Sequence, residues 1–134
     1  MGERLELPIK LTQEESAGID APVDFPTALR WVEGDQALLA ELIQIFLEDC
    51  PGKLHELEHA VKQGHATVVR QAVHALKGMV TCFHTRSAHG LANEMECLAQ
   101  AGEMSKISDL LPTLLLEFAR VMHHLKTADW QGKS

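Results

Sequence analysis

The chain has 134 residues, 46% of them hydrophobic, which suits a single domain with a substantial core. The formal net charge of -7 and the lack of a clustered basic face exclude a nucleic-acid-binding surface. No apolar run approaches the roughly 20 residues of a spanning helix, and the N-terminus lacks the apolar core of a signal peptide. We therefore expect no membrane contact by this domain and a cytoplasmic location.

The apolar pattern predicts an all-α protein. Aromatic residues make up only 4% of the chain, β-branched runs are short, and nearly every apolar cluster repeats at three and four residues. Residues 1–22 mix acids with Gly and Pro without a steady period, which indicates a linker or flexible N-terminal segment. We expect the domain to span residues 23–128 and a flexible tail to cover 129–134.

Two capped helices are predicted first. Asp24 can cap a short helix that starts with Phe25 and Pro26 and ends at Gly34. We expect it to turn its apolar residues, Leu29, Trp31 and Val32, toward the core. Asp35 can cap a second helical stretch that continues to Gly64, although Pro51 leaves open one kinked helix or two stacked ones. Its apolar stripe is Leu39, Leu42, Phe46, Cys50, Leu54, Leu57 and Val61.

Residues 65–84 predict one amphipathic helix with His74 at its middle. Its apolar stripe is Val69, Ala72, Val73, Leu76, Met79, Val80 and Phe83. His74 lies on the opposite side and should face water, together with Gly78 one turn further on. Glycine in a helix interior lowers helix stability by about 1 kcal/mol relative to alanine. The glycine at this position therefore indicates a role other than helix stability.

Two more helices complete the expected architecture. Ala88, Leu91, Ala92, Met95 and Leu98 repeat with the helical period up to Gly102. In the last stretch Pro112 marks either a kink or the true first turn, and the stripe is Ile107, Leu110, Leu111, Leu114, Leu115, Phe118, Met122 and Leu125. Four substantial helices with short links predict an antiparallel four-helix bundle with a short additional N-terminal helix.

The remaining reactive residue types give weak signals. Cys50, Cys82 and Cys97 form no C-x-x-C pair and are expected to be reduced. The pairs His55/His59 and His123/His124 could belong to a histidine-rich metal binder, but further ligands at matching spacing are missing. The chain has neither a phosphate-binding G-x-x-x-x-G-K loop nor a nucleophile elbow. We therefore predict no metal, no intrinsic cofactor and no nucleotide site.

The pattern H-x-x-K-G at His74, Lys77 and Gly78 carries the clearest chemistry. A neutral, solvent-facing imidazole can attack a phosphoryl group through one ring nitrogen and form a phosphoramidate. Lys77 lies three residues on and can offset the charge of the phosphoryl oxygens, while Gly78 leaves room for a partner. An ordinary polar helix face would have the same appearance, so the residues alone leave both interpretations open.

From about Phe25 to Leu125 the sequence resembles the histidine-containing phosphotransfer (HPt) domains of two-component phosphorelays. The resemblance rests on GDQALLAELIQIFLEDCPGKLHELEHAVKQG followed by QAVHALKG. It implies that His74 accepts a phosphoryl group from the aspartyl phosphate of one receiver domain and relays it to a response regulator. The chain would then be a phosphocarrier and not an enzyme, and the receiver would supply Mg²⁺.

The resemblance also assigns a role to Glu96. Some members of the family carry Glu or Gln 22 residues after the histidine, where it bonds the second imidazole nitrogen; here that residue is Glu96, which could equally be a solvated acid on the helix flank. The chain departs from the family at Met79 and Val80, where small residues are common, and at His84, where glycine is common. These departures concern partner docking and the helix junction.

We expect a monomer, excised from a hybrid sensor histidine kinase that can itself be membrane-bound, or else freestanding. Its partners would be the receiver domains of the hybrid kinase and of a response regulator. The expected docking rim consists of Arg70, Gln71, Lys77, Gly78 and Thr81. The alternative is a non-catalytic helical adaptor that binds signalling partners without phosphorylation.

Overall fold

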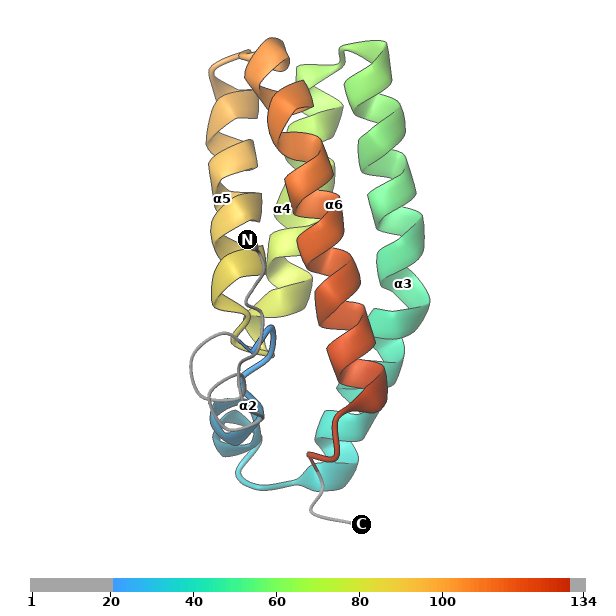
Figure 1. The fold of residues 1–134 in the computed structure, drawn as a ribbon, viewed down its shortest axis with the longest axis vertical. Helices are drawn as coiled ribbons and strands as arrows, with labels where there is room; N and C mark the ends of the chain where they lie inside the picture. Colours follow the sequence, from blue (N-terminus) through green and yellow to red (C-terminus); the bar gives the residue numbers. More distant parts are fainter. Residues whose placement is uncertain (1–20, 131–134) are drawn as a thin grey trace, which may run out of the picture.

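The computed structural model describes residues 21–130, and these residues form five α-helices and no strand. The helices are α2 (Phe25–Trp31), α3 (Gln36–Gln63), α4 (Ala66–Thr81), α5 (Arg86–Gln100) and α6 (Met104–Thr127). The four long helices run alternately up and down, and α2 lies at one end of them (Figure 1). The predicted all-α bundle with a short additional helix is confirmed. No helix in the described part of the chain is long and apolar enough to cross a membrane.

The predicted caps of the first two helices are present. The Asp24 carboxylate accepts a hydrogen bond from the Thr27 N–H (3.1 Å), and the Asp35 carboxylate accepts one from the Leu38 N–H (3.0 Å). Both bonds satisfy N–H groups that have no partner within the helix. At the other end of α3, Gly64 adopts a left-handed conformation with a φ of 71°, which lets the chain turn back toward α4.

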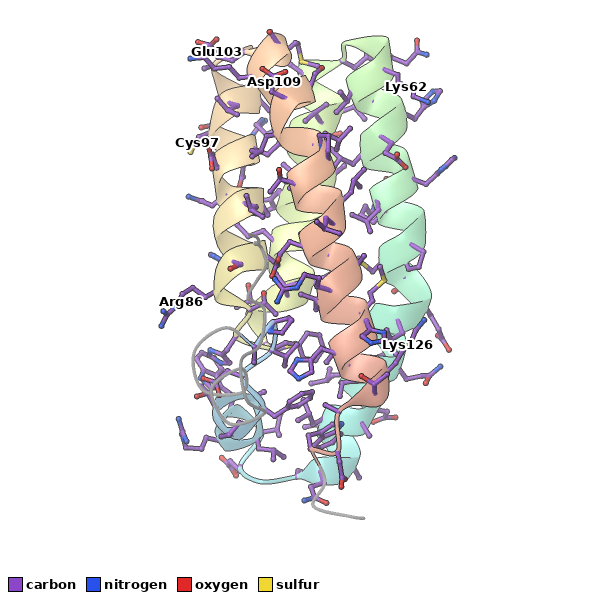
Figure 2. The ribbon with its side chains drawn as sticks, in the orientation of Figure 1. Lys62, Arg86, Cys97, Glu103, Asp109 and Lys126 are labelled. Atoms are coloured by element: carbon purple, nitrogen blue, oxygen red, sulfur yellow. The ribbon has the colours of Figure 1, made fainter. Side chains whose placement is uncertain are left out.

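The core is one cluster to which all the helices contribute. Its largest fully buried side chains include Leu57, Leu76, Met95, Leu114 and Phe118. Charged residues such as Lys62, Arg86 and Glu103 extend from the outside of the bundle (Figure 2). Each long helix therefore buries one apolar stripe against the other helices, as the spacing of apolar residues predicted.

One expectation about the first helix is wrong. Trp31 does not face the core but is 67% exposed, because the seven-residue α2 buries only Phe25 and Ala28. The structure also decides two alternatives that the sequence left open: α3 is a single helix through Pro51, and α6 begins at Met104, so Pro112 is inside it and not in its first turn.

The helix expected over residues 65–84 is shorter at both ends, spanning Ala66–Thr81. The chain then turns through His84, whose φ is 53°, and this turn directs Phe83 into the core although it lies beyond the helix. A β-carbon is disfavoured in this left-handed conformation, which explains why glycine suits the position. The Trp31 ring lies against the His84 ring, with centroids 5.1 Å apart.

The domain boundaries proposed from the sequence are only partly within the described residues. The expected linker falls mostly in residues 1–20, and the end of the expected tail in 131–134, both outside the described part. Val23 is buried, and its N–H donates to His124 Nδ1 (3.3 Å). Trp130 stacks on Phe25 with centroids 5.7 Å apart, so packing continues two residues past the expected domain end at 128.

Candidate functional site

His74 lies on the outer face of α4, and its side chain is 69% exposed. The opposite face of the helix is held in the core by Val69, Ala72, Val73, Leu76 and Val80, all buried. The direction of the imidazole is thus fixed by the apolar stripe, as the sequence predicted.

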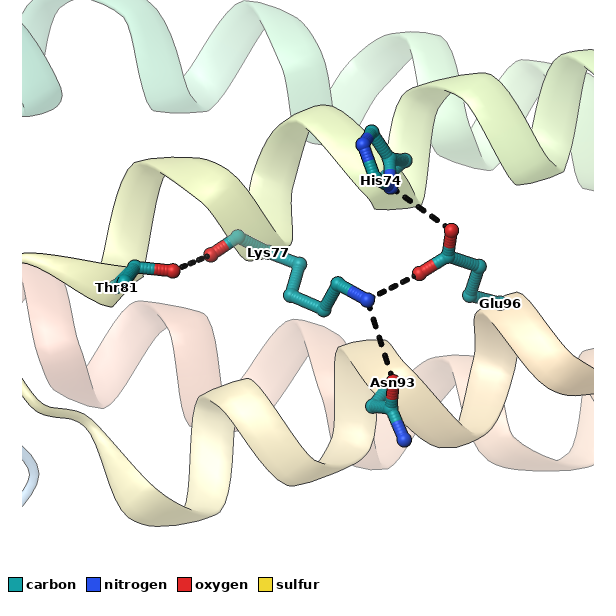
Figure 3. A network of polar contacts seen from close by, with 5 residues as sticks. All are labelled: His74, Lys77, Thr81, Asn93 and Glu96. Carbon is teal, nitrogen blue, oxygen red and sulfur yellow. Dashed lines mark hydrogen bonds and ion pairs between the residues drawn. The ribbon is translucent and has the colours of Figure 1, made fainter.

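Glu96 brings a carboxylate from α5 to this imidazole. Ala92, Met95 and Ala99 turn one face of α5 into the core, which leaves Glu96 at the seam between α4 and α5. Its Oε2 atom lies 2.8 Å from His74 Nδ1, and its side chain is only 15% exposed (Figure 3). The contact implied by the family resemblance is present, and Glu96 is not simply a solvated acid on a helix flank.

This contact determines which ring nitrogen is available. An ionised carboxylate can only accept a hydrogen bond, so the hydrogen must lie on Nδ1. In a neutral imidazole, Nε2 then carries the lone pair. The ionised state of Glu96 is favoured because the Lys77 ammonium, and to a smaller extent His74, holds the pKa of this carboxyl below its usual range although partial burial opposes it.

The contacts of Lys77 differ from those expected from the sequence. The sequence suggested an ammonium free to approach the phosphoryl group, but Lys77 Nζ lies 2.6 Å from Glu96 Oε1 and donates to Asn93 Oδ1 (3.2 Å). Figure 3 shows all three residues, together with His74, in one polar network. Asn93 was missed as a site residue; the signal that could have found it is its position one turn before Glu96 on the same helix.

The other expected rim residues lie on the exposed surface of α4. A β-carbon added to Gly78 would meet nothing within 4 Å, so this stretch of the helix is open to an approaching molecule. Arg70 and Gln71 are exposed. Thr81 is also exposed, but its hydroxyl donates to the Lys77 carbonyl within the helix (2.9 Å).

Comparison with known proteins identifies the family of this chain. The family model described as Hpt domain matches residues 41–126. This chain belongs to the Hpt domain family. Its function is therefore histidine phosphotransfer in phosphorelays, and such proteins are phosphocarriers and not classical enzymes. Hpt domains in general interact with the receiver domains of kinases and response regulators.

A solved structure has the same fold as this Hpt domain. It is the histidine-containing phosphotransfer protein B (HptB) from Pseudomonas aeruginosa PAO1, with a TM-score of 0.74 and 24% sequence identity. The alignment covers 85% of the present chain and 98% of that one. No curated protein sequence matched the chain.

An apolar groove of the Hpt domain borders the His74 surface. It runs between α3 and α4 and is lined by Leu42, Ile45, Phe46, Asp49, Gly78, Met79, Cys82 and Phe83. Ile45 is 52% exposed at its edge, and Gly78 joins the groove to the polar network. The rim expected from the sequence lies on α4 alone and does not include this groove; Ile45, an apolar residue outside the buried stripe of α3, is the signal that could have pointed to it.

The histidine pairs do not gather metal ligands. Within residues 21–130, no group of three or more His, Cys, Asp or Glu side chains could hold a metal ion. His124 is instead part of the packing: it accepts the Val23 N–H, its ring contacts the edge of Phe25 (5.1 Å), and burial lowers its pKa.

Proposed function

We propose that His74 is the phosphorylated residue of this Hpt domain and that Nε2 is the nucleophile. The observation that carries the proposal is the 2.8 Å contact between His74 Nδ1 and Glu96 Oε2. With Glu96 ionised, this contact supports a hydrogen on Nδ1 and an Nε2 lone pair on a side chain that is 69% exposed. This nitrogen can then meet a phosphoryl group carried by another protein.

The transfer conserves the phosphoryl group. The Nε2 lone pair attacks the phosphorus of an aspartyl phosphate, the N–P bond forms, and the P–O bond to the aspartate breaks to release its carboxylate. The second transfer runs in the opposite sense, to the aspartate of another receiver. Lys77 offsets the charge of the phosphoryl oxygens, and Mg²⁺ belongs to the receiver domain, so the Hpt domain needs no cofactor of its own.

Phosphotransfer from a receiver tests the assignment of His74. The protein is incubated with a phosphorylated receiver domain and Mg²⁺, and the acid and base stability of the protein-bound phosphate is measured. We expect an acid-labile, base-stable phosphate on the wild type and none on His74→Gln, which should fold normally because the side chain is exposed. Phosphate retained by His74→Gln would refute the assignment, and a wild type that binds receivers without accepting phosphate would favour the adaptor alternative.

Lys77 has a separate test. We expect Lys77→Ala to slow the transfer while the circular dichroism spectrum stays that of the folded helical bundle. Unchanged transfer kinetics would reduce Lys77 to a surface residue that pairs with Glu96.

The receiver domain is proposed to dock across His74, the rim residues Arg70, Gln71, Lys77, Gly78 and Thr81, and the groove between α3 and α4. The groove supports this because it is apolar and continuous with the His74 surface through Gly78. Asp49 lies in the groove, and Glu48 is exposed on the same helix. We therefore expect a receiver surface with apolar side chains flanked by basic ones.

Two exposed apolar residues allow a matched comparison. Ile45 lies at the groove and is 52% exposed, whereas Leu116 lies on α6 and is 65% exposed. Ile45→Asp should raise the receiver concentration needed for half-maximal transfer, whereas Leu116→Asp should not. Both variants should react normally with phosphoramidate, a small phosphoryl donor that needs no docking surface. Equal effects of the two substitutions would contradict docking at the groove.

The cellular setting is also part of the proposal. The mixed acidic, Gly- and Pro-containing composition of residues 1–22 supports a linker to a hybrid sensor histidine kinase in the cytoplasm. The full reading frame would decide between a kinase domain and a freestanding relay protein. We propose that the Hpt domain acts as a monomer, which sedimentation equilibrium would test.

A further inference from the structure

Asn93 approaches Lys77 from the same side as Glu96. Both residues lie on α5, three positions apart, and therefore on one face of that helix. Asn93 Oδ1 accepts a hydrogen bond from Lys77 Nζ (3.2 Å), while Glu96 Oε1 lies 2.6 Å from the same nitrogen. Figure 3 shows the two acceptors around one ammonium group.

These two acceptors restrict a side chain that is otherwise flexible. A lysine side chain has a flexible four-carbon stem and loses rotamer entropy when it is fixed. The Lys77 side chain is only 22% exposed, so α5 holds it against the seam between the helices. Its ammonium has three N–H donors. Among the described residues the ammonium donates to Asn93 Oδ1 and forms an ion pair with Glu96, so it keeps donor capacity for a phosphoryl oxygen.

The two acceptors differ in charge. Glu96 is ionised and neutralises Lys77, whereas the Asn93 amide holds the ammonium without adding a negative charge. The difference matters because a phosphoryl group brings a charge of about -2 at neutral pH. A second carboxylate beside Lys77 would give the network a net negative charge and repel that group.

We propose that Asn93 is a positioning residue for phosphotransfer, which fixes the Lys77 ammonium beside His74 as a neutral second acceptor. This inference rests on the proposed function of His74 and Lys77. It gives Asn93 no contact with the reacting atoms, because its effect passes entirely through Lys77.

Single-turnover transfer from a phosphorylated receiver tests the proposal. Asn93→Ala should lower the maximal rate by roughly 2- to 10-fold, the range that corresponds to the net contribution of one hydrogen bond, and leave the half-saturating receiver concentration unchanged. Asn93→Asp keeps an acceptor but adds a charge, and should lower the rate roughly 10-fold. Glu94→Ala, at an exposed neighbouring position on α5, should transfer like the wild type.

A double-mutant cycle separates positioning from a structural role. If Asn93 acts through Lys77, the Asn93→Ala effect on the rate should vanish in a Lys77→Ala background. An equal effect in both backgrounds, or an Asn93→Asp rate equal to that of the wild type, would overturn the inference. Either result leaves the proposed function intact as long as the wild type is phosphorylated on His74, whereas a wild type without phosphohistidine would overturn both.

Discussion

Replacing Gly78 by alanine should stabilise the domain and at the same time impair phosphotransfer. Gly78 lies inside α4, and an added β-carbon would meet nothing within 4 Å. The substitution therefore creates no clash, and the helix should gain about 0.8–1 kcal/mol in free energy of unfolding from the higher helix propensity of alanine. For a domain of this size the expected rise in Tm is roughly 4 °C.

The loss of transfer has a different origin. Since no side chain beyond the adjacent residues and no other helix of the described domain lies within 4 Å of the new methyl group, we expect any effect on transfer to arise from contact with the receiver. A leucine reaches further than an alanine, and the cost of forcing extra methylenes into a packed contact is about 1–3 kcal/mol. Gly78→Leu should therefore raise the half-saturating receiver concentration by about 5- to 150-fold, and Gly78→Ala by less.

Gly52 provides the control for this prediction. It lies inside α3, is exposed, and also has nothing within 4 Å of an added β-carbon. Gly52→Ala should give a similar gain in stability, measured by urea unfolding, without any change in transfer. The reasoning is refuted if Gly78→Leu takes phosphate from the receiver as readily as the wild type, because the glycine would then provide no clearance.

Three further predictions concern the core, the network and the cysteines. Leu76 is fully buried, so Leu76→Ala should lower the free energy of unfolding by about 2–5 kcal/mol, and a urea-measured loss below about 1 kcal/mol would contradict its place in the core. The folded-state pKa of Glu96 is lowered by Lys77, so its contribution to stability is present above the ordinary glutamate pKa of about 4.3 and lost as the pH falls through the lowered value. Urea unfolding should therefore find wild type and Glu96→Gln different at neutral pH and converging in acid; a constant difference would argue against the ion pair. Burial raises the pKa of Cys50 to about 12, so a thiol reagent should label exposed Cys97 first and Cys50 only on unfolding, an order that mass spectrometry can check.

The sequence predicted the long helices well because burial and helical period coincide in them. In α3, Cys50 and Leu54 lie on either side of Pro51 in the same buried stripe, and the helix continues through the proline. The pattern could not decide this in advance, since a proline in a helix costs stability that only tertiary packing offsets. Trp31 is the opposite case. Its helix has only two turns, and so few residues do not show which side of the helix packs against the core.

The direction of His74 followed from its helix and its contact with Glu96 from the family resemblance, but the partners of Lys77 were not predicted. His74 had to point outward because the stripe of α4 points inward, and that argument needs only the sequence of one helix. The contacts of Lys77 with Glu96 and Asn93 depend on how closely α4 and α5 pack and in which register. Those quantities come from the whole core, so no local pattern around His74 contains them.

We propose that the same network lets His74 both accept and release a phosphoryl group. In the proposed mechanism Lys77 attracts the phosphoryl oxygens, but the same ammonium is paired with Glu96 in the unphosphorylated domain. The phosphoryl group would share the Lys77 ammonium with Glu96, whose negative charge reduces the net gain from phosphorylation. Because Glu96 also bonds Nδ1, it favours the nucleophilic tautomer through one oxygen and limits the retention of the phosphoryl group through the other. A carrier between two aspartates needs both effects, since a phosphoryl group held too tightly on His74 would not move on to the second receiver.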